Sequence, residues 1–137
     1  MKRFHLSREA RERLLGLLTY FHTDMLELSL ALIAFAWGAF LLLPLDSYAA
    51  TPAFRVMRRL PEELLGLGMA LLGLAHLFAV LRGSVRARRW LAFVTAGVWT
   101  IISITFLLSS PASTAAITYP LLAFFSALIF LRLGVEV

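Results

Sequence analysis

The stretch "FHTDMLELSLALIAFAWGAFLLL", residues Phe21–Leu43, decides the fold class. Beyond Met25 it is almost wholly apolar, and an α-helix needs about 20 such residues to cross the hydrocarbon core of a bilayer. Two carboxylates, Asp24 and Glu27, stand at its start. The stretch therefore predicts a transmembrane helix that carries acidic side chains near one membrane surface.

Three more segments of the chain are apolar enough to cross a membrane. None alternates like a barrel strand, and only helices or closed barrels satisfy every backbone group in lipid. The 137-residue chain is 61% hydrophobic and 15% charged, whereas a soluble domain is about 45–50% apolar and about 25% charged. We predict an all-α integral membrane protein, a single domain with four transmembrane helices at about 25–43, 64–81, 90–108 and 115–133.

Net charge and cysteine content limit the classes of partner and of chemistry that the chain can have. The net charge of +5 lies between apolar segments, which favours a lipid bilayer surface over nucleic acid. The chain has no cysteine, so disulfides, thiolate catalysis and cysteine metal sites are excluded. No cleaved signal peptide is expected, because the first apolar run is too long and lacks a small-x-small cleavage site.

The distribution of basic residues predicts the topology. One side would carry the arginines and lysine of the N-terminal arm, of the second loop and of the C-terminus: Lys2, Arg3, Arg8, Arg11, Arg13, Arg82, Arg86, Arg88, Arg89 and Arg132. The other side would carry only Arg55, Arg58 and Arg59. The positive-inside rule then places both termini in the cytoplasm, with the protein in the cytoplasmic (inner) membrane. Contacts with lipid headgroups are expected from Arg8, Arg11, Arg82, Arg86, Arg88 and Arg89.

Two further segments are predicted to be amphipathic helices. The arm 1–22 has an apolar stripe that ends at Phe21 and would lie in the cytoplasmic interface. In the first outer loop, Thr51–Pro52 is a helix-start signal. After it, Phe54, Met57 and Leu60 share one face, with the arginines largely opposite. This second helix would lie on the outer surface.

The acids at the start of the first span have two interpretations. "DMLE" fits a capping box, in which Asp24 caps backbone N–H groups and Glu27 reaches back to the Asp24 N–H. Alternatively, Glu27 faces the bundle interior at the depth of His76 on the second span, because an ionisable residue within a span is a functional candidate. Such a pair would relay protons, bind a metal or simply pin two helices.

Small residues mark the faces that would pack helix against helix. On the first span these are Ala31, Ala34 and Gly38, and on the second Gly66, Ala70 and Gly73. On the third span they are Ala92, Ala96, Thr100 and Ser103, which suit either packing within one bundle or an oligomer seam with a mildly polar wall.

No catalytic constellation is found. The chain has no phosphate-binding glycine loop, no paired-histidine zinc motif and no nucleophile elbow. We therefore expect no enzyme, no metal and no cofactor. A b-type haem held by His22 and His76 is a minor alternative, because His22 is expected at the interface and turned away from Glu27.

Part of the chain resembles small four-span membrane proteins of phage and prophage genomes. The resemblance runs from "WGAFLLLPLDSYAATPAFRVMRRLPEELLGLGMALLGLAHL" through "FLLSSPASTAAITYPLLAF", that is, roughly from Trp37 to the end. The matching positions are Trp37, Gly38, Pro44, Pro52, Phe54, Pro61, Glu62, Gly66, Pro111, Ala112, Ser113, Thr114 and Tyr119. Here "SSPAST" stands where those proteins have "NPAST", and the arginine-rich arm is not part of the pattern. The resemblance implies a viral setting and no mechanism.

Three functions follow as hypotheses. The first is a non-enzymatic membrane protein that self-associates as a homo-oligomer and alters permeability, in the manner of a holin or a superinfection-exclusion protein. The second is an accessory subunit of a larger membrane complex. The third is a small proton or ion conductor that uses Glu27 and His76.

Overall fold

The computed structural model describes residues 23–44 and 54–135. Over these residues the chain is helical and contains no strand, and four helices are long and apolar enough to cross a membrane. This confirms the predicted class of an all-α, multi-pass membrane protein. The amphipathic arm 1–22, with Arg8, Arg11 and His22, lies outside the described residues, as does Thr51–Pro52.

The four long helices are close to their predicted positions. They are α2 (Thr23–Leu41), α4 (Glu62–Leu81), α5 (Val85–Ser109) and α6 (Ala115–Leu133). The largest difference is in α5, which begins at Val85 rather than at Trp90. Hydropathy marks only the part of a helix that lipid covers, whereas "VRARR" is rich in good helix formers and continues the same helix.

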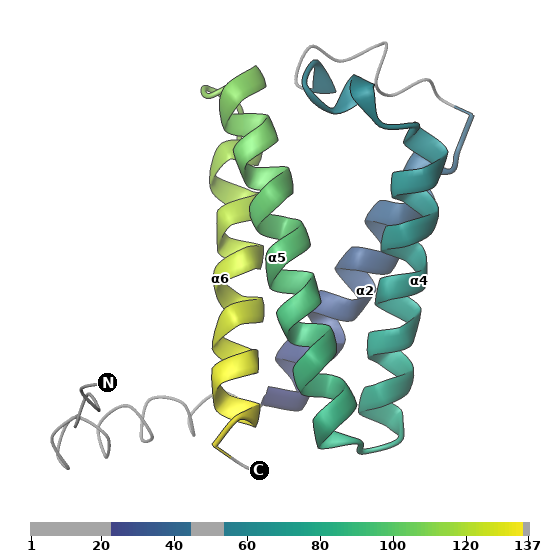
Figure 1. Ribbon diagram of the computed structural model, residues 1–137, viewed down its shortest axis with the longest axis vertical. Coiled ribbons are helices and arrows are strands. Elements are labelled where there is room, and N and C mark those ends of the chain that lie inside the picture. The colour runs from purple at the N-terminus through teal and green to yellow at the C-terminus, as the bar shows by residue number, and fades with distance from the viewer. Residues whose placement is uncertain (1–22, 45–53, 136–137) are drawn as a thin grey trace, which may run out of the picture.

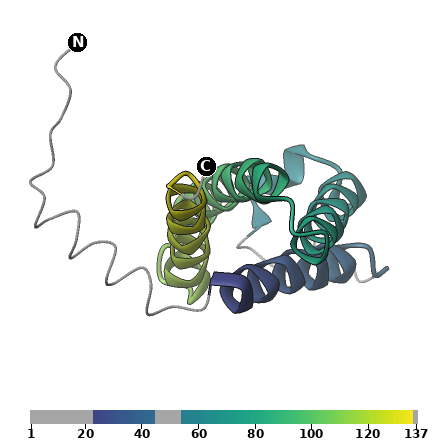
Figure 2. The ribbon, with the colours of Figure 1, turned by 90° about the horizontal axis from the view of Figure 1, so that it is seen from below.

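The helices form two tightly packed pairs, α2 with α4 and α5 with α6. Figure 1 shows α2 crossing obliquely behind α4, and Figure 2 shows α5 lying between α4 and α6. A short turn at Gly83, whose φ is 65°, joins α4 to α5. We call this end of the bundle the turn end, and the opposite end, where α4 and α5 diverge in Figure 1, the splayed end.

Glycines set the close approach of α2 and α4. A Cβ atom on Gly38 would lie 2.3 Å from the backbone nitrogen of Ala70, and one on Gly73 would lie 2.5 Å from that of Phe35. The small stripes predicted on these two helices meet here, because Ala31, Ala34, Gly38, Gly66, Ala70 and Gly73 are all buried. The pair is therefore held by backbone-to-backbone contact, which larger residues would prevent.

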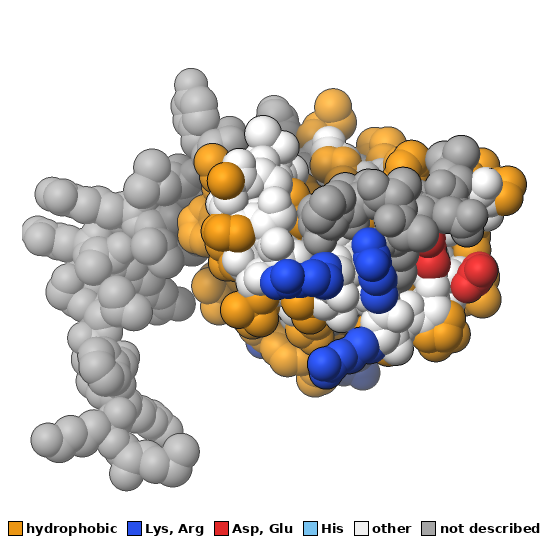
Figure 3. Space-filling view, turned by 90° about the horizontal axis from the view of Figure 1, so that it is seen from above, with side chains coloured by type: hydrophobic (Ala, Val, Ile, Leu, Met, Phe, Trp, Pro, Cys, Tyr) orange, Lys and Arg blue, Asp and Glu red, His pale blue; other side chains and the backbone are white. Residues whose placement is uncertain are grey.

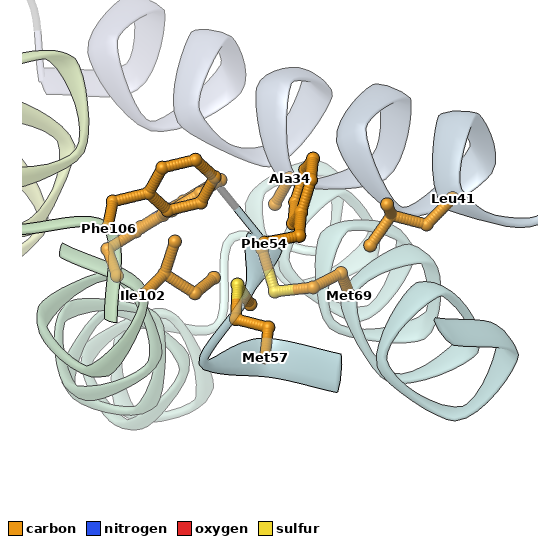
Figure 4. Close-up of a cluster of buried hydrophobic side chains, with 8 residues drawn as sticks. Ala34, Leu41, Phe54, Met57, Met69, Ile102 and Phe106 are labelled. Atoms are coloured by element: carbon orange, nitrogen blue, oxygen red, sulfur yellow. The ribbon is translucent and has the colours of Figure 1, made fainter. Parts of the chain in front are cut away.

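The splayed end is filled by the segment that precedes α4. The sequence predicted an amphipathic helix on the surface, but the described part is a 3-10 turn, η2 (Met57–Arg59). Phe54 and Met57 are buried in the core, whereas Leu60 is exposed. Figure 4 shows Phe54 and Met57 among side chains from α2, α4 and α5, and the Phe54 ring meets that of Phe106 edge-on at 5.1 Å.

Candidate functional site

Glu27 lies at the turn end of the bundle interior, where its side chain is fully buried. Both of its oxygens accept hydrogen bonds from Arg88 of α5. The Arg88 Nε atom lies 2.8 Å from Oε2, and Nη2 lies 2.8 Å from Oε1. This two-pronged geometry is the strongest arrangement of a guanidinium and a carboxylate. It neutralises the one acid that α2 carries into the core.

Arg88 also connects the buried acid to an exposed one. Its Nη2 atom donates to Oδ1 of Asp24, whose side chain is 77% exposed. One guanidinium therefore bridges two carboxylates that are almost one helical turn apart on α2. The cluster links the two helix pairs, because both acids belong to α2 and the cation belongs to α5.

His76 of α4 is the innermost member of the cluster. Its side chain is only 1% exposed, and its Nε2 atom lies 3.7 Å from Oε2 of Glu27. That separation is too long for a hydrogen bond. Neither ring nitrogen has a hydrogen-bond partner within residues 23–44 and 54–135. Buried polar atoms normally have partners, so these two nitrogens are an exception within the core.

Local packing explains why these residues meet. Gly73 brings the backbones of α4 and α2 together, and His76 follows it by three residues on the same face. Glu27 lies one turn before Ala31, whose carbonyl oxygen is in that contact. Arg88 belongs to the first turn of α5, where its N–H donates to the carbonyl of Ser84 at 2.9 Å. The meeting of Glu27 and His76 at one depth was expected from the sequence.

Arg88 differs from its sequence-based interpretation. It was expected among the residues that contact headgroups, yet its side chain is only 11% exposed and binds two acids. The capping-box interpretation also fits poorly, because both Glu27 oxygens are engaged by Arg88 rather than by the start of α2. A signal was present in the sequence, because an acid inside a span commonly pairs with another ionisable side chain.

The other loop arginines lie at the turn end. The guanidinium of Arg82 stacks 4.2 Å from the ring of Phe78, and that of Arg89 stacks 5.0 Å from the ring of Phe130. Arg86 and Arg82 are exposed, so both can still reach headgroups. Arg8 and Arg11 lie outside the described part of the chain.

An aromatic layer lies between the cluster and the splayed end. Trp99 is fully buried and stacks on Tyr119, with ring centroids 5.5 Å apart and planes at 11°. The Nε1 atom of Trp37 donates to the hydroxyl oxygen of Tyr119 at 3.0 Å. Trp99 belongs to the buried core, and Trp37 and Tyr119 pack against it, so aromatic side chains fill this part of the described bundle.

The predicted face of α5 is divided between the interior and the outside. Ala92 and Ser103 are buried, but Ala96 is half-buried and Thr100 is exposed. The interior positions of α5 are instead Ala92, Thr95, Trp99, Ile102, Ser103 and Phe106. The exposed part, near Gly97 and Thr100, remains available to a partner.

Neither chemistry nor comparison assigns a reaction to this cluster. In the described ranges, no group of three or more histidine, aspartate or glutamate side chains is placed to hold a metal ion. Comparisons with protein-family models, with curated proteins and with solved structures give no match. The cluster can do two things chemically: hold two helix pairs together and offer His76 as a proton acceptor.

Proposed function

We propose that the protein is a non-enzymatic, self-associating protein of the cytoplasmic membrane that alters membrane permeability. The observation that supports the proposal is the exposed patch of α5 formed by the small residue Gly97 and the polar residue Thr100. A Cβ atom on Gly97 would meet nothing within 4 Å, and Thr100 nearby satisfies its own hydroxyl by donating to the Ala96 carbonyl at 2.8 Å. Such a face suits the close approach of another helix in lipid.

The filled interior supports the same proposal. Aromatic rings and the Phe54–Met57 segment occupy the space above the charged cluster. A route for solutes would therefore form between copies rather than through one bundle. The resemblance to small membrane proteins of phage supports a holin-like or superinfection-exclusion setting.

We place the turn end and both termini in the cytoplasm, on the basis of the positive-inside rule. The chain has no cysteine, so single cysteines can be introduced without any background. Ser84→Cys, in the turn, should react with a membrane-impermeant maleimide only after lysis, whereas Ser113→Cys, between α5 and α6, should react in spheroplasts with an intact inner membrane. The reverse labelling pattern would overturn this orientation.

The experiment for the proposed function combines association and leak. The full chain is induced in cells, and a potential-sensitive dye is followed together with an impermeant nucleic-acid dye. Cross-linking in the same membranes reports association. We expect both dyes to respond, and Gly97→Leu to suppress cross-linking and dye entry together. Gly68→Leu is the matched control, because Gly68 also has open space but lies on α4.

Two results would count against self-association as the cause of leak. One is an unchanged response of both dyes while the protein is present in the membrane, which would direct attention to the accessory-subunit hypothesis and to a partner. The other is dye entry that survives when Gly97→Leu has removed the cross-links.

A second candidate function, proton conduction, is favoured by the two open nitrogens of His76 beside Glu27. It predicts loss of membrane potential without entry of the impermeant dye. His76→Leu and Glu27→Gln should each abolish that loss, while Gly97→Leu should not. Under self-association, Gly97→Leu should suppress the dye response, whereas His76→Leu and Glu27→Gln should leave it unchanged. The three variants therefore distinguish the two candidate functions.

A further inference from the structure

An apolar groove runs between α4 and α5 on the outside of the bundle. Its volume is about 510 Å³, and almost all of its lining is apolar. From α4 it is lined by Leu64, Gly68, Leu71 and Ala75, which recur at the spacing of one helical face. Val94 and Val98 of α5 form part of the opposite wall. The groove exists because Gly68 and Ala75 are small and because α4 and α5 diverge toward the splayed end (Figure 1).

The length of the groove matches one leaflet of a bilayer. From Leu64 to Ala75 the helix rises about 16 Å, and half of a hydrocarbon core is about 15 Å. Leu60 lines the groove just before α4 begins, at the splayed end. The groove is therefore open at the membrane surface and extends to about the middle of the bilayer.

The segment that leads into Leu60, at the splayed end of the groove, carries an excess of positive charge. Arg55, Arg58 and Arg59 are exposed immediately before Leu60 in the sequence, and Glu62 and Glu63 follow in the first turn of α4. Figure 3 shows blue side chains spread over this end of the molecule and red ones at its edge. The acids are stabilised by the N-terminal dipole of α4, and three arginines remain against two acids among residues 54–63.

We propose that this groove binds one anionic phospholipid, with an acyl chain between α4 and α5 and the phosphate at the arginines of residues 55–59. The apolar lining matches the chain, and guanidinium groups match a phosphate oxygen by charge and by hydrogen-bond geometry. The lipid belongs to the leaflet that borders the splayed end. The inference goes beyond the proposed function and does not depend on it.

A second copy of the chain fits the groove less well. The lining offers almost no polar atoms, whereas hydrogen bonding between polar side chains is one of the forces that join helices in lipid. An anionic headgroup, in contrast, complements the exposed arginines at the splayed end.

The test measures which lipids stay bound to the full-length protein. The purified chain in detergent is supplied with equal amounts of phosphatidylglycerol and phosphatidylcholine with the same chains, and bound lipids per protomer are counted by native mass spectrometry. Gly68→Leu adds a side chain to the groove lining, at a position where a Cβ atom would meet nothing within 4 Å. Gly97→Leu makes the same change at an equally open glycine outside the groove. A third variant replaces Arg55, Arg58 and Arg59 by glutamine.

We expect the wild-type chain to retain phosphatidylglycerol over phosphatidylcholine, by about fivefold for each arginine that contacts the headgroup. Gly68→Leu should lose both lipids, Gly97→Leu should retain both, and the arginine variant should lose the preference. Circular dichroism verifies that each variant is folded, and the arginine variant, which leaves the core unchanged, tests the proposal even if Gly68→Leu does not fold.

Two results would overturn the proposal. One is equal retention of the two lipids by the wild-type chain, and the other is unchanged retention by a folded Gly68→Leu. If that variant keeps its lipids and also loses the cross-links between copies, the groove belongs to a second copy. The proposed function is tested independently, by the effect of Gly97→Leu on cross-linking and on entry of the dyes.

Discussion

Arg88 holds both oxygens of Glu27, each at 2.8 Å, across 61 residues of sequence and between two helix pairs. The acid is fully buried and the cation nearly so. Removal of one partner from such a pair leaves an uncompensated charge, which is more costly than the pair is stabilising.

Arg88→Gln should therefore lower the free energy of unfolding by about 3–5 kcal/mol. The measurement is unfolding of the purified protein in mixed detergent micelles. Arg86→Gln is the matched control, because Arg86 is exposed on the same turn of α5 and should change stability by less than about 0.5 kcal/mol. Asp24→Asn should cost at most about 1 kcal/mol, since Asp24 is largely exposed. Equal losses for Arg86→Gln and Arg88→Gln would contradict a specific role of the pair.

The glycine contacts between α2 and α4 give a second prediction. Gly38→Ala and Gly73→Ala should each destabilise the bundle by about 1–3 kcal/mol, because the added Cβ would meet backbone atoms of the facing helix. Gly68→Ala and Gly97→Ala should be neutral or stabilising by up to about 1 kcal/mol, because alanine is the better helix former. Thermal unfolding followed by circular dichroism compares the four, and a similar effect at all of them would refute the contact.

Tyr119 gives a third prediction, because it both stacks and accepts a hydrogen bond. Tyr119→Phe keeps the ring beside Trp99 but leaves the Trp37 N–H without its acceptor. We expect a loss of about 1 kcal/mol with the near-ultraviolet circular dichroism largely retained. Tyr119→Leu should lose about 0.5–1.5 kcal/mol more, together with the aromatic signal. If both variants keep the wild-type spectrum, the stacked arrangement is wrong.

The segment before α4 gives a fourth prediction. Phe54→Ala should cost about 3 kcal/mol, because the ring is buried against Phe106. Leu60→Ala, six residues later, removes a side chain that is 52% exposed and should change stability much less. Chemical unfolding of the two variants side by side measures the difference. The opposite order would restore the surface-helix interpretation of this segment.

The fold was largely predictable because lipid imposes a simple rule on sequence. Each span needs enough consecutive apolar residues, and the predicted ranges agree with the four helices except where α5 continues into charged residues. The meeting of Glu27 with His76 was also predictable, because helical periodicity and a common depth are both readable from the chain.

The partner of Glu27 and the burial of Phe54 were not predictable by the same means. Arg88 was grouped with the loop arginines because charge counting has no information on helix tilt. The oblique path of α2 takes its first turns away from α4 and toward α6 (Figures 1 and 2), and there Glu27 meets Arg88 of α5. The spacing of Phe54, Met57 and Leu60 in the sequence fits a helix on the membrane surface as well as it fits a segment buried in the core. Its first two members enter the core only because α4 and α5 diverge and leave space there.

The separation of Glu27 and Arg88 along the chain has a consequence for biogenesis. A nascent chain emerges N-terminus first, so α2 reaches the membrane before Arg88 does. During that interval Glu27 is already in its helix while its guanidinium partner, 61 residues later, is still missing. The arrival of Arg88 supplies the missing cation, so the buried acid is neutralised only when α5 packs onto the first helix pair.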